Sequence, residues 1–119
     1  LPNVSFGLYG MRRHVDPGHV TRGQRQGAQA ALAAARQAVA SGEYDMVILD
    51  EANLAAAWGL VQVEDLLDVI QCKAPKVELV LTGRNADPKL IAHADYVTRM
   101  ECLKHPYEHG TVARKGVEF

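Results

Sequence analysis

The sequence predicts an α/β fold built on a largely parallel sheet, and three observations carry this prediction. Expected strands and helices alternate along the chain, as they do in βαβ units. Two of the expected strands, "DMVILDE" and "KVELVLTGR", contain the nearly continuous apolar runs of strands covered on both faces. The chain has 119 residues, of which 48% are apolar, and a formal net charge of −1, so a single globular domain over residues 1–119 is expected.

The first half of the chain is expected to hold two strands and one helix. A short aromatic-rich strand is predicted at residues 4–10, and a loop with a Pro-Gly pair follows at 11–23. The next segment has helical apolar spacing and is expected to end at Gly42. Its apolar stripe consists of Ala28, Ala31, Leu32, Ala35 and Val39. The second strand, at residues 45–51, runs into two adjacent carboxylates, Asp50 and Glu51.

The second half is expected to continue the alternation. An amphipathic helix is predicted at residues 63–73 and a buried strand at 76–84. Asp87 is expected to cap a helix whose first residue is Pro88. A fourth, more polar strand is predicted at residues 95–103, near a sheet edge.

The composition indicates which partners, cellular location and cysteine state to expect. There is no basic excess, so nucleic acid is not an expected partner. No apolar run reaches transmembrane length and no secretion signal is present, so we expect a cytoplasmic protein that does not bind membranes. Cys72 and Cys102 match no metal spacing and are expected to be reduced core thiols. Because the first residue is Leu1, we expect a processed or truncated product, or part of a longer protein.

Two short motifs follow the buried strands, where ligands of parallel sheets bind. "VILDE" is an apolar strand followed by acids, the Walker B pattern, in which one or two carboxylates hold Mg²⁺. The alternative is that Asp50 or Glu51 caps the next helix or forms a salt bridge. "TGR" places Thr82, Gly83 and Arg84 at the other strand end, where Gly83 permits a tight turn and Arg84 is placed to contact phosphate or carboxylate. The alternative for Arg84 is an ion pair with Asp50 or Asp87.

Other candidate residues give weaker signals. The basic and histidine residues of the tail are interpreted as surface groups, and three further histidines have no paired acid in sequence and receive no role. The tail group is Lys104, His105, His109, Arg114 and Lys115, and the further histidines are His14, His19 and His93. Trp58 and residues 54–57 are expected in the core or at a subunit interface, with a pocket as the alternative. The chain contains neither G-x-x-x-x-G-K-[ST] nor G-x-S-x-G.

Three segments together resemble the C-terminal portion of ATP:corrinoid adenosyltransferases of the P-loop type. They are "YDMVILDEANLAAAWGLV", "LVLTGRNADPKLIAHADYVTRM" and "KHPYEHGTVARKGVEF". Three separated motifs in the right order make the resemblance specific. It implies a RecA-like α/β fold, with helices on both faces of the sheet and incomplete at its N-terminus.

The resemblance also implies a reaction and its participants. The 5′-deoxyadenosyl group of ATP would pass to the cobalt of cob(I)alamin or a related corrinoid, with triphosphate as the leaving group. Glu51, with Asp50, would bind the Mg²⁺ of Mg-ATP, and Arg84 would act at the phosphates. Asp50, Glu51, Thr82, Gly83 and Arg84 would form the nucleotide site. A homodimer and a flavoprotein reductase partner are implied as well.

The sequence departs from the family pattern in two places. The phosphate loop of the family precedes the region that matches Leu1, so these residues alone are expected to be inactive, and translation upstream is expected to reveal G-x-x-x-x-G-K-[ST]. The loop at residues 11–18 has no aromatic residue, although family members present aromatic residues to the corrinoid there. The alternative function is therefore a non-catalytic corrinoid- or protein-binding domain of the same fold. A mechanical P-loop ATPase ranks last because it explains none of the tail motif.

Overall fold

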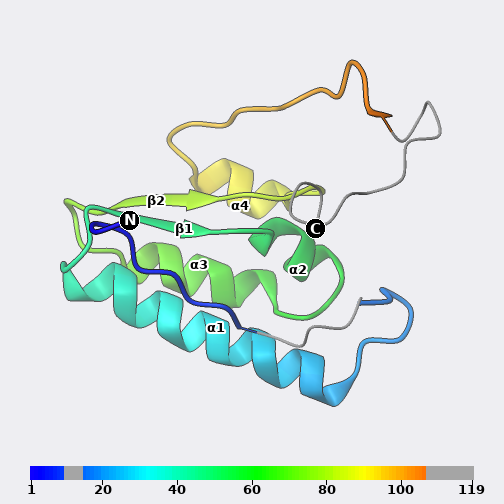
Figure 1. Ribbon diagram of the computed structural model, residues 1–119, viewed down its shortest axis with the longest axis horizontal. Helices are drawn as coiled ribbons and strands as arrows, with labels where there is room; N and C mark the ends of the chain where they lie inside the picture. Colours follow the sequence, from blue (N-terminus) through cyan, green and yellow to red (C-terminus); the bar gives the residue numbers. More distant parts are fainter. Residues whose placement is uncertain (10–14, 107–119) are drawn as a thin grey trace.

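The computed structural model describes residues 1–9 and 15–106. Its elements are α1 (Arg22–Ser41), β1 (Met46–Leu49), α2 (Ala52–Ala57), α3 (Val63–Cys72), β2 (Glu78–Leu81) and α4 (Pro88–His93). β1 and β2 pair in parallel, from Met46 opposite Glu78 to Leu49 opposite Leu81 (Figure 1). Because α2 and α3 connect the two strands, this is the βαβ arrangement that the alternating sequence predicted.

The three expected helices form, and Gly42 and Asp87 act as the predicted end signals, but α1 begins at Arg22, inside the predicted loop 11–23. At the start of α1, Thr21 and Gln24 exchange hydrogen bonds in a capping box, and Gly42 ends the helix with a φ of 71°. α3 begins at Val63, as its amphipathic spacing predicted. At α4, the Asp87 side chain accepts a hydrogen bond from the backbone N–H of Lys89 over 2.8 Å. The N-cap prediction for Asp87 is therefore confirmed.

The short helix α2 was not predicted. It has six residues, which is too short for helical propensity alone to stabilise it. Tertiary contacts hold it instead: Ala52 is buried in the core, and the backbone N–H of Asn53 donates to the carbonyl of Thr82 over 3.1 Å. α2 therefore forms because β2 lies beside it.

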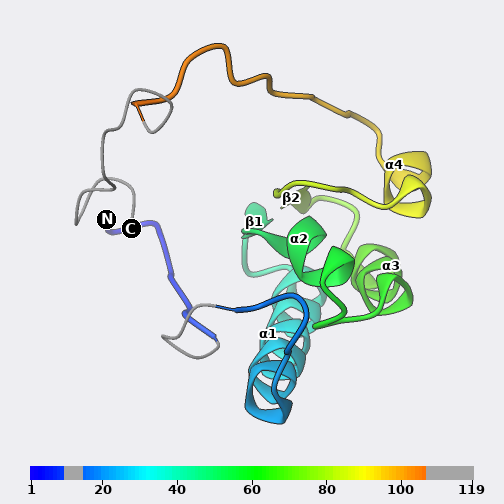
Figure 2. The ribbon, with the colours of Figure 1, turned by 90° about the vertical axis from the view of Figure 1, so that its right-hand side faces the viewer.

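The core lies between the strands and the helices α1 and α3, which pack on the same face of the sheet (Figures 1 and 2). Val39 of α1 and Val69 of α3 are almost fully buried and contact the inward side chains of the strands. Leu66 of α3 joins a second cluster with Leu90 of α4. Burial of each such side chain contributes about 1.5–3 kcal/mol. Ala28, Leu32, Ala35 and Val39 of the predicted stripe of α1 pack into these two clusters.

The opposite face of the sheet is open in the part of the chain that the structure describes. Side chains alternate between half-buried and exposed along both strands, and Met46 and Ile48 are 54% and 59% exposed. The prediction of strands covered on both faces by helices is therefore not met by the described helices. A continuous apolar run cannot by itself distinguish a strand covered on two faces from one covered on one face.

Two predicted strands do not form within the described residues. Residues 4–9 of the predicted strand 4–10 and residues 95–103 are outside the sheet, in which β1 and β2 pair only with each other. Phe6 and Met100 are 87% and 90% exposed. Figure 2 shows both segments away from the strands. Their apolar patterns fit strands, but a strand also needs a pairing edge, and that contact is non-local.

Two expectations from composition concern the cysteines and the membrane. Cys72 and Cys102 form no disulfide, but both are exposed, so the prediction that they lie in the core is wrong. Cys72 ends α3, and Cys102 lies in the exposed segment after α4, so neither position is covered. Within the described residues, no helix combines the length and the apolar character needed to cross a membrane.

Candidate functional site at the carboxyl ends of the strands

The carboxyl ends of β1 and β2 lie side by side because the strands are parallel and in register. Leu49 pairs with Leu81, so Asp50 and Thr82 are the next residues of the two strands. The ladder continues one step further, since the backbone N–H of Thr82 donates to the carbonyl of Leu49 over 3.1 Å. The two motifs "LDE" and "TGR", separated by about thirty residues, therefore meet at one edge of the sheet, as predicted.

Thr82 connects the two motifs through its side chain. Its hydroxyl donates a hydrogen bond to Oδ1 of Asp50 over 2.6 Å. The same oxygen accepts a hydrogen bond from the backbone N–H of Glu51 over 3.0 Å. A hydroxyl that donates to a carboxylate forms a short, charge-assisted bond. Asp50 and Glu51 are thus both fixed by one side chain from the neighbouring strand.

Glu51 has an unusual backbone for a residue with a side chain. Its φ and ψ are 57° and 21°, in the left-handed region, and it occupies the position before α2. Such a conformation is uncommon for a non-glycine residue and persists where neighbouring contacts impose it. The Glu51 side chain makes no capping hydrogen bond to α2. The helix-cap alternative for Glu51 is therefore excluded, and its carboxylate is exposed at the end of the sheet.

Gly83 continues from Thr82 with a φ of 116° and approaches Glu51 closely. A Cβ on this residue would lie 3.1 Å from Oε2 of Glu51 and 3.1 Å from the backbone nitrogen of Leu54. A side chain at this position would therefore meet both the carboxylate and the first turn of α2. The positive φ of Gly83 agrees with the turn expected there, and the chain bends at the next two residues, Arg84 and Asn85.

Asn53 is the residue of this site that sequence reasoning missed. Its side chain is 8% exposed, and its Nδ2 donates to the carbonyl of Gly83 over 3.3 Å. Together with the bond from its backbone N–H to Thr82, this joins the start of α2 to the "TGR" turn. A buried amide with hydrogen-bond partners fixes the geometry around it. The sequence feature that could have identified Asn53 is its position as a polar residue in the otherwise apolar run after Glu51.

Arg84 is exposed, and the described residues supply no ion pair between it and Asp50 or Asp87. The Asp50 carboxylate accepts from Thr82 instead, and the Asp87 carboxylate caps α4. The ion-pair alternative for Arg84 is therefore not realised. Its guanidinium is open to a ligand that carries phosphate or carboxylate oxygens.

A broad, open depression of about 950 Å³ borders the two carboxylates. Its wall includes the exposed side of β1, part of α1, residues 5–9 and the α2 region with Leu54 and Trp58. Trp58 is half-buried and faces this space. Trp58 belongs to neither buried core cluster, while Ala55 and Ala56 of the same segment pack against the core, as expected. The interface and pocket interpretations of Trp58 stay predictions.

The carboxylates fit a hard divalent cation. Oδ2 of Asp50 takes no part in the bond to Thr82, and Glu51, the next residue, has its carboxylate close to Gly83. Among the described residues, no three Asp, Glu, His or Cys side chains gather into a complete metal site. Mg²⁺ commonly takes one or two carboxylates and completes its shell with water and substrate phosphates. Asp50 and Glu51 are therefore suited to Mg²⁺ that arrives with a nucleotide.

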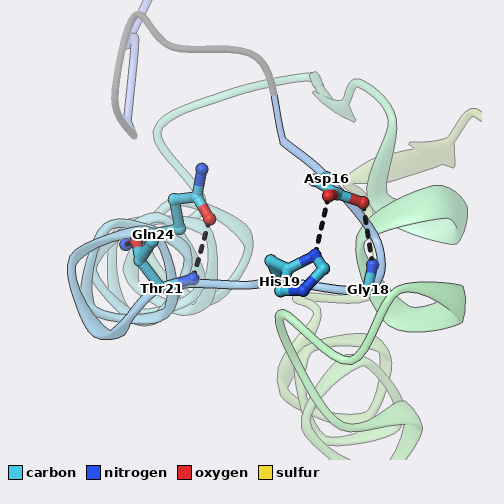
Figure 3. A network of polar contacts seen from close by, with 5 residues as sticks. All are labelled: Asp16, Gly18, His19, Thr21 and Gln24. Atoms are coloured by element: carbon cyan, nitrogen blue, oxygen red, sulfur yellow. Dashed lines mark hydrogen bonds and ion pairs between the residues drawn. The ribbon is translucent and has the colours of Figure 1, made fainter.

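Among the described histidines, His19 has an acidic partner that the sequence did not suggest. Nδ1 of His19 lies 2.8 Å from Oδ2 of Asp16, whose Oδ1 accepts from the backbone N–H of Gly18 (Figure 3). The statement that His19 has no paired acid is therefore wrong; the turn at Pro17 and Gly18 brings Asp16 back to it. This pair is exposed and precedes α1. Predictions for His14, His109, Arg114 and Lys115 lie outside the described residues.

Comparisons with known proteins identify the family of this chain. The profile of the family described as ATP:corrinoid adenosyltransferase BtuR/CobO/CobP matches residues 7–119. The chain is 40% identical over 92 residues to the corrinoid adenosyltransferase of Pseudomonas aeruginosa, covering 77% of this chain and 45% of that protein. It is 39% identical over 93 residues to that of Sinorhizobium sp, covering 77% and 44%. For the enzyme of Escherichia coli strain K12, identity is 25% over 85 residues, covering 71% and 43%. The chain spans less than half the length of these relatives.

Proposed function

The chain belongs to the ATP:corrinoid adenosyltransferase family, and from this membership we propose its function. In the full-length protein it takes part in transferring the 5′-deoxyadenosyl group of ATP to the cobalt of cob(I)alamin or a related corrinoid. The observation that carries the proposal is the meeting of "LDE" and "TGR" at one sheet edge, where Thr82 bonds Asp50 and Glu51. Ligands of parallel sheets bind at this edge.

The proposed roles follow from the position of each group. Glu51 and Asp50 hold Mg²⁺, which would neutralise charge on the triphosphate that leaves. Arg84, exposed and without an ion pair to the neighbouring acids, binds the same phosphates. Thr82 and Gly83 form the floor of the nucleotide site. The reaction breaks the bond between C5′ and the triphosphate oxygen as Co(I) supplies the electron pair for the new cobalt–carbon bond.

The corrinoid is proposed to approach through the depression beside the two carboxylates. That space carries Leu54 and Trp58 on one side and the apolar outer side chains of β1 on another. An apolar wall suits a large macrocycle, while the charged strand ends suit the nucleotide. A RecA-like sheet, a homodimer, a flavoprotein reductase partner and a cytoplasmic location are further parts of the proposal.

Product formation tests the proposal directly. The full-length protein is incubated with Mg-ATP and cobalamin reduced chemically to Co(I), and adenosylcobalamin is quantified by absorbance and chromatography. We expect product that depends on both ATP and Mg²⁺. No product with ATP, Mg²⁺ and Co(I) all present would reject adenosyl transfer.

Isothermal titration distinguishes the enzyme from the alternative, a non-catalytic binding domain. Full-length protein is titrated with Mg-ATP and, separately, with cobalamin. The enzyme is expected to bind both. Binding of cobalamin without binding of Mg-ATP would favour the non-catalytic corrinoid-binding domain.

A further inference from the structure

The Thr82 hydroxyl donates its hydrogen to another residue of the protein. A threonine hydroxyl has one hydrogen to donate and two lone pairs. The hydrogen goes to Oδ1 of Asp50 over 2.6 Å, and one lone pair accepts from the Glu51 N–H over 3.0 Å. The Thr82 hydroxyl is therefore committed to the two acidic residues and has no hydrogen left to donate to a phosphate oxygen.

Each of these two bonds controls a different property of the site. The bond to Oδ1 fixes the orientation of the Asp50 carboxylate and leaves Oδ2 for a cation. The bond from the Glu51 N–H helps to hold its left-handed backbone, with φ of 57°, and so sets where the Glu51 side chain starts. Partners that orient the ligands of a metal influence its affinity although they do not touch it.

Hydrogen bonds from Asn53 fix the backbone at Thr82. Its carbonyl accepts from the Asn53 N–H over 3.1 Å, and the next carbonyl, of Gly83, accepts from Asn53 Nδ2 over 3.3 Å. Because Asn53 is buried, the hydroxyl projects from a fixed backbone toward Asp50 and Glu51.

We propose that Thr82 is a positioning residue, which orients the Asp50 carboxylate and the Glu51 backbone for one divalent cation and does not donate to the nucleotide. This inference rests on the proposed function, of which it refines the metal site. It predicts that the hydroxyl of residue 82 changes cation affinity through Asp50.

The test uses Mn²⁺ as a paramagnetic probe of the cation site. Free Mn²⁺ is measured by electron paramagnetic resonance in titrations of the full-length protein with ATP present. Thr82→Val, which replaces the hydroxyl by a methyl group, is expected to weaken Mn²⁺ binding by about 10–100-fold. Thr82→Ser restores the hydroxyl and is expected to stay within about threefold of the wild type. Thr98→Val is the matched control on an exposed threonine outside the site, and it is expected to bind as the wild type does.

A second variant shows whether Thr82 acts through Asp50. Asp50→Asn is expected to weaken Mn²⁺ binding, and adding Thr82→Val to it is expected to cause a smaller loss than Thr82→Val causes in the wild type, because only the effect through the Glu51 backbone remains. Residues that act as one unit are non-additive in this way. Fully additive losses would overturn the proposal, as would Thr82→Val binding Mn²⁺ like the wild type. If Thr82→Val does not fold, the Mn²⁺ titration of Asp50→Asn is the test that remains. Unchanged Mn²⁺ affinity in that variant would overturn the proposal.

Hydrogen exchange supplies a readout that is independent of any ligand. The Glu51 amide is expected to exchange faster in Thr82→Val and at the wild-type rate in Thr82→Ser, because only the valine removes its acceptor. Equal exchange in all three proteins would overturn the positioning role. Wild-type protein that binds Mn²⁺-ATP but makes no adenosylcobalamin would reject the proposed function and leave this inference standing. Wild-type protein that binds no Mn²⁺ would overturn the inference itself.

Discussion

Gly83 lies so close to Glu51 that a side chain at residue 83 would crowd it. A Cβ on Gly83 would approach Oε2 of Glu51 to 3.1 Å and its Cα to 3.2 Å. The two residues belong to different strand ends, and their contact brings the "TGR" turn against the carboxylate proposed to bind Mg²⁺. The size of residue 83 therefore decides where the Glu51 side chain can be.

Replacement of this glycine is the first prediction. Gly83→Ala is expected to lower the free energy of unfolding by about 1–3 kcal/mol, because alanine is strained at a φ of 116°. It is also expected to weaken cation binding, since the new methyl group displaces Glu51 or the first turn of α2. Urea denaturation measures the first effect, and Mn²⁺ titration with ATP measures the second.

Gly59 offers a matched control for that variant. Its φ is 73°, also unfavourable for alanine, but a Cβ there would have no atom within 4 Å. Gly59→Ala is expected to lose about 1–2 kcal/mol of stability and to keep wild-type affinity for the cation. If both variants bind Mn²⁺ equally well, the close contact between Gly83 and Glu51 has no role in cation binding.

The Glu51 carboxylate is the subject of the second prediction. Glu51→Ala is expected to abolish adenosyl transfer, with a loss of about 100-fold or more, since it removes a proposed metal ligand. The fold is expected to remain, because the side chain is exposed and makes no capping bond. Glu51→Gln keeps the size and removes the charge, and it is expected to lose activity as well. Turnover at the wild-type level in both variants, with unchanged circular dichroism, would remove Glu51 from the metal site.

Arg84 gives the third prediction. Arg84→Gln is expected to weaken ATP binding by about tenfold, which corresponds to one lost charge-assisted contact of about 1.4 kcal/mol. Its unfolding midpoint is expected to stay unchanged, because the structure shows no ion pair from Arg84 to Asp50 or Asp87 among the described residues. Isothermal titration measures the affinity. Arg36→Gln, which removes an exposed arginine paired with Asp68, controls for the loss of a positive charge. Equal ATP affinity in both variants would argue against a phosphate contact.

The sequence was most informative where local chemistry decides the structure. Gly42 and Asp87 marked helix ends correctly because capping depends on a few neighbouring residues, whereas the capping residue Thr21 was assigned to a loop. The "LDE" and "TGR" motifs could be placed at one sheet edge because parallel neighbouring strands have their carboxyl ends together. The pairing of Asp50 with Thr82 could not be predicted, since it depends on the register between the strands.

The failures have a common physical origin in contacts between distant segments. Residues 4–10 and 95–103 have apolar patterns suited to strands, but such patterns do not determine whether a pairing edge is available. α2 is too short to form on propensity and depends on the bond from Asn53 to Thr82. The left-handed backbone of Glu51 is likewise imposed from outside its own segment, by the hydroxyl of the neighbouring strand.

An ion pair between α3 and α4 leads to the fourth prediction. Nζ of Lys89 donates to Oε1 of Glu64 over 2.9 Å, with both side chains more than half exposed. This hydrogen bond, with the charge of Lys89, lowers the pKa of Glu64 from its ordinary value of 4.5. The same bond raises the pKa of Lys89 from 10.5. Each partner thus favours the charged form of the other.

The two shifts set the pH window in which the bridge stabilises the fold. For Glu64, whose pKa is lowered on folding, the contribution is present above pH 4.5 and is lost as pH falls through the folded pKa. For Lys89, whose pKa is raised, it is present below pH 10.5 and is lost as pH rises through the folded pKa. The bridge therefore stabilises the protein between these limits and weakens outside them.

Glu64→Gln tests this window because it removes one charge and keeps the size of the side chain. Its deficit in urea midpoint relative to the wild type is expected to be small, greatest between pH 4.5 and 10.5, and reduced at both extremes. The deficit is also expected to shrink in 1 M NaCl, since exposed pairs are screened. Glu43→Gln removes an equal charge from a carboxylate that has no ion pair within the described residues, and so reports the effect of net charge alone. A Glu64→Gln deficit that matches the Glu43→Gln deficit at every pH would mean that the bridge to Lys89 contributes nothing to folding.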